Sequence, residues 1–337
     1  MLVDKNDLAK LKDYNDFVRK SEYGSICQDT HWAIVKDTWE AVYFYKEKEG
    51  KIIGALSVIY IHDKELDSNF YYAPRGPVCD LYDIDLVVSL IDEAKEYIGK
   101  NGGFLLRLDP EVVYDKDLVE AYRKRGLNFI IDEKSSSQPT RSLILEIKGR
   151  NIDQIFKGFS KNTRKHIRHS YKSGITSQLV GREKIKEFAE TIKIMAERAG
   201  IGYRDEAYFR RLFDAFPNDI ALTFTSLGEE LLSVSMMICY GRKCFSLYGA
   251  SNNKLRNLSQ NYQINYEEVK YAVEHGYKEY DMGGIFSVDE DDGLYSFKRK
   301  FTEDNVKNWI GELDVIFDKE KYLKFRRRSN PDFEIGN

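Results

Sequence analysis

The strongest constraint on the fold is a succession of elements that occurs twice along the chain. In its first occurrence, a predicted strand hairpin over residues 40–60 is followed by a long helix over 84–100. The glycines of the run 101–103 end this helix. An apolar strand over 104–108 comes next and leads into Asp109. Strands and helices in this order predict a sheet with helices on its faces.

The second occurrence lies in the other half of the chain. Three predicted strands within 220–250 precede a long helix over 259–275, which Gly276 closes. A further strand over 278–282 carries Asp281. The two halves share this order without being a sequence repeat. We therefore predict an α/β (α+β) fold with two related modules and mixed sheets, an order that resembles acetyltransferase-like (GNAT-like) folds.

The module boundaries follow from composition. The polar stretch 132–140 predicts the exit from the first module. We expect the first module to span residues 1–140 and the second to span 141–314. The tail reads as a strand and a basic helix, and we expect it to return to the first module over 315–337.

The chain carries no predicted membrane span. Its 337 residues have a mean hydropathy of -0.52, and the longest apolar run, 231–240, is far shorter than the roughly 20 residues that a spanning helix needs. Residues 1–20 alternate in charge where a secretory signal would be apolar. We therefore expect a cytoplasmic protein without stable membrane insertion.

Neither a disulfide nor a metal site is predicted. His166 and His169 have helical spacing, but they lie in a basic run, so a solvated face explains them better than a metal site. The acidic run 289–292 lacks the glutamate that an EF-hand loop needs. The cysteines form no C-x-x-C pair, which predicts buried reduced thiols at Cys27, Cys79, Cys239 and Cys244.

The most unusual local feature is a basic segment over 159–172. It holds five lysines and arginines and no acidic residue, although the whole chain has a net charge of -3. Ser160 is placed to cap a helix on which Arg164, Arg168 and Lys172 share one face. Such a stripe can follow the phosphates of a nucleic acid or nucleotide, and a solubilising face explains it equally well.

A second unusual feature follows Asp281. Gly283 and Gly284 permit close approach of a ligand to the backbone at a strand end, where α/β proteins tend to bind ligands. Lys298 comes shortly afterwards. A lysine near such a cleft can stabilise an oxyanion or a phosphate.

The sequence lacks a turn for coenzyme A. Acetyltransferase-like folds hold the pyrophosphate of this coenzyme on a glycine-containing turn that opens a helix, but the corresponding segment, 254–260, contains no glycine. Neither a Walker A motif nor a G-x-S-x-G motif occurs. We therefore expect an activity that uses neither coenzyme A nor another cofactor.

Eight motifs, in order between residues 10 and 320, resemble one family. They lie at 28–36, 72–78, 106–111, 159–172, 201–208, 247–251, 280–285 and 294–298. On these residues the chain resembles the Fem/Mur (FemABX) peptidyltransferases, which use aminoacyl-tRNA to build the interpeptide bridges of peptidoglycan. The resemblance is greatest to the short FemX-type alanyltransferases.

The resemblance implies two tandem acetyltransferase-like modules, with the acceptor in the cleft between them. Longer relatives insert a coiled-coil arm, whereas here Gly200 follows directly on the helix predicted over 182–199, which implies the short form without an arm. The implied reaction transfers alanine, serine or glycine from aminoacyl-tRNA to the side-chain amine of the third stem-peptide residue. The acceptor would be UDP-MurNAc-pentapeptide or lipid II, and the enzyme would be a monomer.

The resemblance also assigns an acceptor site. The residues that match those holding the acceptor in FemX-type enzymes are Lys36, Arg204, Tyr208 and Tyr248. Lysine and arginine neutralise pyrophosphate, and tyrosine hydroxyls donate to phosphate oxygens. Core packing is the alternative explanation for the two tyrosines.

Three further residues match positions near the reacting groups. Lys298 matches a lysine near the donor ester, with Phe297 beside it, and Asp109 matches a possible base. A strand-end aspartate bonded to its own loop is the alternative for Asp109. The candidates for tRNA contact are Lys161, Arg164, Arg168 and Lys172.

Two other functions are open at this stage. An N-acyltransferase that uses acyl coenzyme A would need the pyrophosphate turn that the sequence lacks. A non-catalytic protein that binds cell-wall precursors would keep Lys36 and Arg204 but tolerate loss of Lys298. The pair Phe297 and Lys298 favours the enzyme.

Overall fold

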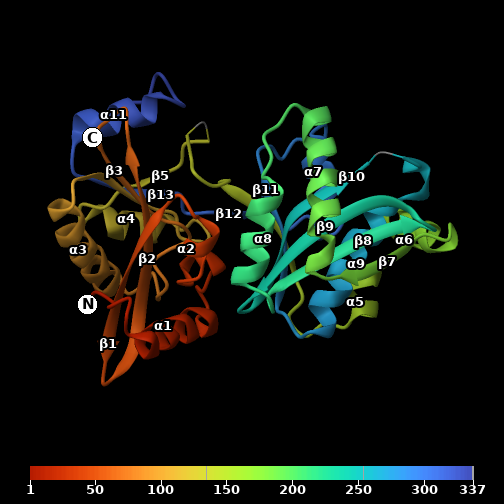
Figure 1. Cartoon of the computed structure of the whole chain (residues 1–337), viewed down its shortest axis with the longest axis horizontal. Coiled ribbons are helices and arrows are strands. Elements are labelled where there is room, and N and C mark those ends of the chain that lie inside the picture. The colour runs from red at the N-terminus through yellow and green to blue at the C-terminus, as the bar shows by residue number, and fades with distance from the viewer. Residues whose placement is uncertain (134, 253, 336–337) are drawn as a thin grey trace. The chain divides into compact units, whose positions relative to one another are not determined.

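The structure, a computed structural model, describes residues 1–133, 135–252 and 254–335 (Figure 1). The chain divides into two compact units, each with its own sheet. Unit 1 comprises residues 1–141 together with the segment from 308 onward, and unit 2 comprises 142–307. The C-terminal segment therefore rejoins the first unit at 308, earlier than the expected 315.

Unit 1 is built on a six-stranded mixed sheet in the order β1-β2-β3-β4-β13-β5. β3 and β4 run parallel, and their carboxyl ends therefore meet at one edge. The C-terminal strand β13 lies between β4 and β5, so the tail completes the first sheet. The strands are β1 (Glu40–Lys48), β2 (Lys51–Asp63), β3 (Ser68–Ala73), β4 (Gly103–Leu108), β5 (Phe129–Ile130) and β13 (Glu312–Ile316).

The long helix of unit 1, α3 (Ile84–Lys100), packs on β1, β2 and β4. Asp83 caps it by accepting a hydrogen bond from the backbone N–H of Leu86. Its buried residues recur at helical spacing and form the face against the sheet: Val87, Leu90, Ile91, Ala94 and Ile98. The other helices are α1 (Leu8–Lys20), α2 (Trp32–Val35), α4 (Lys116–Arg123) and α11 (Lys319–Arg327).

Unit 2 is built on a seven-stranded sheet in the order β12-β6-β11-β10-β9-β8-β7. β10 and β11 pair in parallel from Lys243 to Phe245, opposite Glu279 to Asp281, whereas β10 stays paired with β9 as far as Ser251. The sheet is therefore open between β10 and β11 beyond Phe245. The strands are β6 (Arg141–Glu146), β7 (Thr176–Val180), β8 (Ile220–Leu227), β9 (Glu230–Tyr240), β10 (Lys243–Ser251), β11 (Glu279–Ile285) and β12 (Val306–Asn308).

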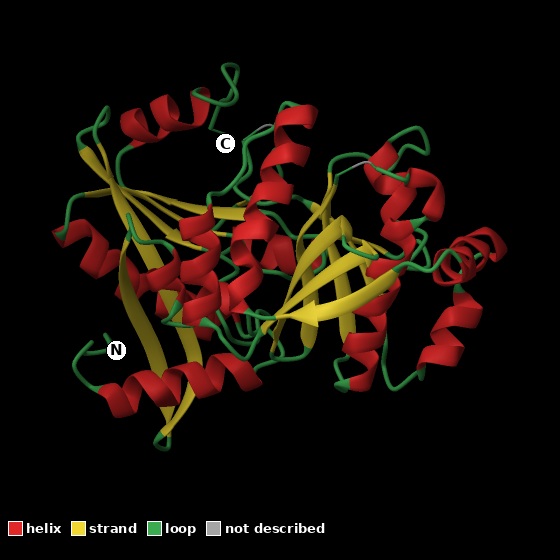
Figure 2. Ribbon diagram, turned by 45° about the vertical axis from the view of Figure 1, so that its right-hand side comes forward, coloured by secondary structure: helices red, strands yellow, loops and turns green. Residues whose placement is uncertain are grey.

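The long helix α9 (Gln260–Glu274) contacts five strands of this sheet, and α7 (Ile185–Ala199) contacts β9 and β10. Figure 2 shows helices in red beside the yellow strands. α7 ends at Gly200, which adopts a left-handed φ of 66°. α8 (Glu206–Ala215) begins a few residues later, so the prediction that no coiled-coil arm is inserted is confirmed. The remaining helices are α5 (Ile152–Gly158), α6 (Lys161–Lys172) and α10 (Gly293–Lys298).

One expectation from composition is wrong. Cys239 and Cys244 lie directly opposite each other on β9 and β10 and are joined as a disulfide, so not all four cysteines are free thiols. A cross-strand register of this kind arises from the hairpin, and cysteine spacing alone does not reveal it. Cys27 and Cys79 are free.

The composition of the chain predicts no membrane-spanning helix. No helix in the part of the chain that the structure describes is long and apolar enough to cross a bilayer.

Candidate active site

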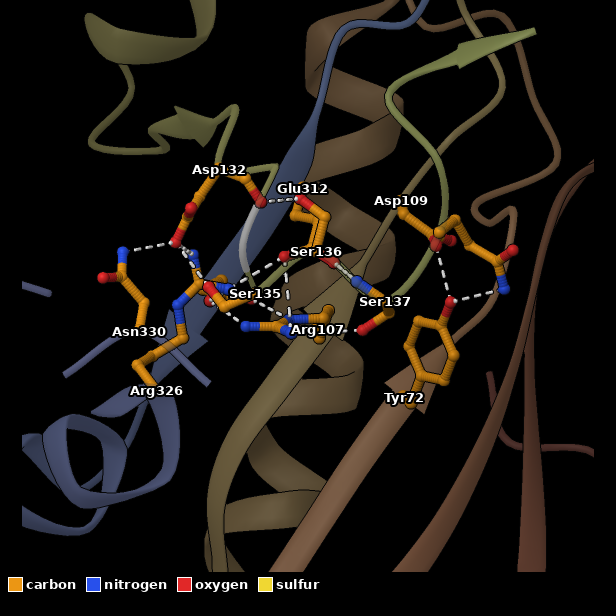
Figure 3. Close-up of polar contacts among 12 residues, drawn as sticks. Tyr72, Arg107, Asp109, Asp132, Ser135, Ser136, Ser137, Glu312, Arg326 and Asn330 are labelled. Atoms are coloured by element: carbon orange, nitrogen blue, oxygen red, sulfur yellow. Dashed lines mark hydrogen bonds and ion pairs between the residues drawn. The ribbon is translucent and has the colours of Figure 1, made fainter. Parts of the chain in front are cut away.

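The end of β4 places a carboxyl group at the edge of the sheet in unit 1. Ala73 and Leu108 are paired where β3 and β4 end, and Asp109 is the next residue. Asp109 is 3% exposed. It accepts a hydrogen bond from the Tyr72 hydroxyl at 2.5 Å (Figure 3) and another from the Arg75 backbone N–H at 2.5 Å. Both donors belong to β3 and the turn after it, so Asp109 joins the two strand ends.

The environment of Asp109 makes it a proton acceptor near neutral pH. Burial raises the pKa of Asp109 to about 6, although the Arg75 guanidinium and the Tyr72 hydroxyl both favour the charged form. A carboxyl group with a pKa in this range is mostly ionised at pH 7 and still basic enough to take a proton.

One cation, Arg75, lies near this carboxyl group, and a second, Lys36, acts on the nearby thiol of Cys27. Arg75 has a left-handed φ of 58°, and its charge lowers the pKa of Asp109. Lys36 ends α2, with its Nζ 5.7 Å from the centroid of the Trp32 ring. Both cations act on the thiol of Cys27, whose pKa burial nevertheless raises to about 11. This edge of unit 1 therefore holds two cations together with two acids, because Arg75 faces the charge of Glu111 as well as that of Asp109.

A second polar network, partly labelled in Figure 3, joins two buried arginines to three acidic residues. The Arg107 guanidinium donates through Nε and Nη2 to the two carboxylate oxygens of Asp314, each at 2.8 Å. Arg326 donates to Glu312 at 2.9 Å, and Ser137 links both pairs by accepting from Arg107 and donating to Glu312. The network ties the polar stretch 132–140 to β13, so we assign it a structural role.

This assignment predicts a large loss of stability in Arg107→Met. The substitution leaves the Asp314 carboxylate, whose side chain is 0% exposed, without its bidentate partner. Breaking a buried ion pair on one side typically costs about 3–5 kcal/mol, and we expect the free energy of unfolding to fall by about that amount. Urea titration followed by circular dichroism measures it. As a control, Arg123→Met removes an exposed arginine of α4 and should cost less than about 1 kcal/mol; equal losses would contradict the structural role.

In unit 2, three of the predicted acceptor-binding residues lie together. Asp205 caps α8 by accepting from the Tyr208 N–H at 2.8 Å, which fixes Arg204 and Tyr208 at the start of the helix. The Arg204 guanidinium lies 5.2 Å from the centroid of the Tyr208 ring. Tyr208 meets Tyr248 of β10 edge to face, with ring centroids 6.4 Å apart. Tyr208 is buried and also packs on Phe209, whereas Arg204 is exposed and can meet an anion.

A cavity of about 390 Å³ lies beside β10 past the point where its pairing with β11 ends. Its lining includes Phe297 and Lys298, which the family resemblance places near the reacting ester. β9 and β10 supply much of the wall, α9 contributes Asn261, Ile264 and Asn265, and Met282 comes from β11. The remaining lining residues are Met195, Arg198, Val234, Ser235, Ser246, Leu247, Gly249, Ala250, Ser251 and Leu294.

Lys298 is held at this cavity by the end of β11. Its Nζ donates a hydrogen bond to the Gly284 carbonyl at 2.8 Å. Burial lowers the pKa of Lys298 to about 8, while Asp281 and Asp292 favour the ammonium form. The amine is therefore charged at neutral pH and readily loses its proton above it. Phe297 lies edge on to Tyr262, with ring centroids 5.7 Å apart.

The acidic run before Lys298 has a local structural role. Asp292 caps α10 by accepting from the Tyr295 N–H at 2.7 Å, and Glu290 accepts from Arg299 at 2.8 Å. Among the residues that the structure describes, no group of three histidine, cysteine, aspartate or glutamate side chains is placed to hold a metal ion.

The basic segment forms α6, and Ser160 caps it as predicted, accepting from the Thr163 N–H at 3.1 Å. The predicted stripe is divided. Arg164 donates to the Lys157 and Phe159 carbonyls, which commits it to the end of α5. The other three predicted residues, Lys161, Arg168 and Lys172, line an open groove of about 670 Å³. Asn162, Lys165 and His169 also line this groove.

The histidines of α6 contact the segment that opens α9. His166 Nδ1 lies 3.0 Å from the Ser259 hydroxyl, and His169 Nε2 lies 3.0 Å from the Asn257 carbonyl oxygen. His166 also stacks on Tyr262 with ring centroids 4.5 Å apart. In acetyltransferase-like folds this segment would hold the pyrophosphate of coenzyme A, whereas here its Ser259 and Asn257 groups contact the two imidazoles.

Comparison with known proteins decides the family. The model of the FemAB family matches residues 10–230 and 227–326. The chain is 32% identical over 329 residues to the UDP-N-acetylmuramoylpentapeptide-lysine N(6)-alanyltransferase of Weissella viridescens, covering 95% of this chain and 97% of that protein. The chain belongs to the FemAB family.

Two more similarities extend across this FemAB chain. It is 26% identical to the lipid II:glycine glycyltransferase of Staphylococcus aureus, with 92% of each chain covered. The crystal structure of FemX superimposes with a TM-score of 0.86 at 25% identity, covering 94% of this chain and 98% of FemX. With the likeness to a solved tandem GNAT protein, this confirms the predicted fold class of tandem acetyltransferase-like modules. The relatives are named as transferases, and the FemAB chain is a transferase.

Sequence reasoning missed Arg75. Its motif was recognised, but no role was given to the arginine between two prolines and a glycine. The available signal was a charged residue placed directly after an apolar strand, between Pro74 and Gly76. The parallel pairing of β3 with β4, which puts Arg75 next to Asp109, is a long-range contact and is not visible in the local pattern.

Proposed function

We propose that this FemAB protein transfers an amino acid from aminoacyl-tRNA to the side-chain amine of the third residue of a peptidoglycan stem peptide. The observation that carries the proposal is Lys298, a lysine with a pKa of about 8 beside Phe297 in the unit 2 cavity. The relatives named above act as an alanyltransferase on UDP-N-acetylmuramoylpentapeptide-lysine and as a glycyltransferase on lipid II.

The chemistry asks little of the protein beyond orientation and charge. The acceptor amine attacks the ester carbonyl of the aminoacyl-tRNA, forming a C–N bond. The C–O bond to the tRNA ribose then breaks, the amine loses a proton, and the ribose oxygen takes up a proton and leaves as a hydroxyl group. Because the ester is already activated, positioning the two substrates and stabilising the oxyanion supply most of the catalysis. Lys298 is the proposed partner of that oxyanion, and Asp109 is the proposed acceptor of the proton.

The acceptor residues have properties that fit a pyrophosphate and a peptide. In unit 1, Lys36 is a half-buried cation at the end of α2. In unit 2, the exposed Arg204 lies over Tyr208, which packs edge to face on Tyr248. Guanidinium groups bind phosphate oxygens with two parallel hydrogen bonds, and an aromatic ring beneath keeps the guanidinium in place.

The donor tRNA is proposed to contact the groove on α6. Lysine and arginine side chains along an open groove suit a nucleic-acid backbone, and binding of this kind weakens as salt rises. The proposed contacts are Lys161, Arg168 and Lys172. Arg164 contributes by joining α6 to α5. We also propose that the protein acts as a monomer in the cytoplasm, where charged tRNA is found.

Transfer of label tests the proposal directly. The purified protein is incubated with UDP-MurNAc-pentapeptide, or with lipid II, and with tRNA that carries radiolabelled alanine, serine or glycine. We expect label in the stem peptide with one of the three amino acids, because the relatives transfer alanine and glycine. Free amino acid with uncharged tRNA serves as the control and should give no labelled peptide.

Other outcomes of this experiment separate the rival functions. Binding of the precursor without transfer from any charged tRNA would favour a non-catalytic binding protein. Transfer from acyl coenzyme A in place of tRNA would favour the acetyltransferase alternative. The contacts of His166 and His169 with the segment before α9 make the second outcome unexpected.

A further inference from the structure

Two serines of the unit 2 cavity lie against a buried acid. Ser235 on β9 and Ser246 on β10 line the cavity. Glu268 on α9 is 2% exposed, and both serine hydroxyls lie close enough to favour its charged form. The Tyr280 hydroxyl donates to Glu268 Oε2 at 2.6 Å. Ser246 is partly exposed and the Ser235 hydroxyl is buried, so Ser246 stands between the cavity and the Glu268 carboxyl group.

This group has unused hydrogen-bonding capacity. Across residues 1–133, 135–252 and 254–335, Ser235 Oγ and Glu268 Oε1 are buried without a hydrogen-bond partner of good geometry. Burial raises the pKa of Glu268. A buried carboxyl group with one unsatisfied oxygen lowers stability, and each such group in a folded protein calls for an explanation.

The missing partner has a definable chemistry. A serine hydroxyl can donate its proton to the carboxylate behind it and accept a hydrogen bond from a ligand in front. A ligand that donates several hydrogen bonds and carries positive charge would satisfy Ser246 from the cavity and, through the buried serine hydroxyls, Glu268. A primary ammonium group is such a ligand, with three donors and no acceptor.

The donor substrate carries an ammonium group at the required place. In an aminoacyl ester, the α-ammonium is attached to the carbon next to the reacting carbonyl. Lys298, the proposed partner of that carbonyl oxygen, lines the same cavity as Ser235 and Ser246. One small cavity can therefore hold the carbonyl at one point and the ammonium at another.

We propose that Ser235 and Ser246, backed by Glu268, form the subsite for the α-ammonium group of the transferred amino acid. The inference rests on the proposed function and deepens it. Ser246 is the contact, and Ser235 and Glu268, which are buried behind it, are positioning residues. The subsite selects an aminoacyl ester over an acyl ester that lacks the amine, and it fixes the rotation of the ester against Lys298.

The test compares two donors that differ only in the group at the subsite. Alanyl-tRNA carries the α-ammonium, and lactyl-tRNA carries a hydroxyl in its place. We expect the wild-type protein to use alanyl-tRNA with a kcat/KM about 10- to 100-fold higher, the size expected for hydrogen bonds to a charged group. Glu268→Gln and Ser235→Ala should each lower kcat/KM for alanyl-tRNA and leave the value for lactyl-tRNA within about twofold.

Matched variants separate a subsite from a structural role. Tyr280→Phe removes the internal hydrogen bond to Glu268 Oε2 and should keep the preference for alanyl-tRNA. Ser235→Ala removes one hydroxyl that makes no hydrogen bond in the described part of the chain, so it keeps the test valid if Glu268→Gln fails to fold.

Equal use of both donors by the wild-type protein would overturn the subsite and leave the proposed function standing. An equal fall in kcat/KM for alanyl-tRNA and lactyl-tRNA in Glu268→Gln and in Ser235→Ala would also overturn the subsite. Transfer from neither donor would overturn the proposed function and the subsite together.

Discussion

Lys298→Met is expected to lower kcat for amino-acid transfer by about 100- to 1,000-fold, the effect of removing one oxyanion donor. Methionine keeps the length of the side chain and its packing beside Phe297 but carries no charge and no donor. The loss should fall on kcat, because the oxyanion exists only in the transition state and the ground-state ester gains little from the lysine. Initial rates with radiolabelled donor, measured at saturating acceptor, give the value.

Lys300→Met is the matched control for this experiment. Lys300 lies two residues further along the chain, outside the residues that line the cavity, with its Nζ 3.4 Å from the Tyr262 hydroxyl. Its replacement should change kcat less than about threefold, because the hydrogen bond to Tyr262 is long and weak. A rise in KM for the donor at unchanged kcat in Lys298→Met would assign the lysine to substrate binding instead.

The position of Lys298 illustrates what the sequence reveals and what it hides. The paired glycines after Asp281 and the lysine that follows were visible, and they suggested a ligand at a strand end. The cavity itself depends on the point where β10 and β11 stop pairing, after Phe245 and Asp281. That register joins strands separated in sequence by the whole of α9, and no local pattern determines it. The family resemblance, not periodicity, connected Lys298 to an ester.

The helices could be predicted from the sequence more completely than the contacts between them. The caps at Ser160 and the glycine stop at Gly276 follow from local chemistry, and α6 and α9 begin and end close to where they were expected. The stripe on α6 was only partly right. Helical spacing puts Arg164 on the same face as Arg168, but the α5 carbonyls that bind the Arg164 guanidinium come from an earlier turn of chain. Spacing does not predict that contact.

Buried polar groups were the least predictable part of the site. Nothing in the sequence distinguishes Glu268 from the solvated glutamates of other helices, because burial of a carboxyl group is decided by the sheet against which the helix packs. The same holds for Asp109. Its family counterpart suggested a base, and burial at the paired ends of β3 and β4 raises its pKa, against the opposing effect of Arg75 and Tyr72.

The pH dependence of transfer should therefore be bell-shaped. Asp109 has a raised pKa of about 6, so as a base it is lost when the pH falls through 6. Lys298 has a lowered pKa of about 8, so as a cation it is lost when the pH rises through 8. We expect kcat/KM to be highest between these values. Measurement of transfer from pH 5 to 9 with a stable donor ester gives the profile.

Asp109→Asn tests which group causes the acidic limb. If Asp109 takes the proton, the variant should lose about 100- to 10,000-fold in kcat/KM and the acidic limb with it, because asparagine keeps the hydrogen bond from Tyr72 but cannot accept a proton. Asp92→Asn, on the exposed face of α3, should leave rate and profile unchanged. If the acidic limb persists in Asp109→Asn with a modest fall in rate, the carboxyl group only joins β3 to β4, and the proton leaves the amine by another route. The acidic limb distinguishes the two roles. Protonation of a general base lowers the rate and produces this limb, whereas protonation of a carboxyl group that only joins two strands does not.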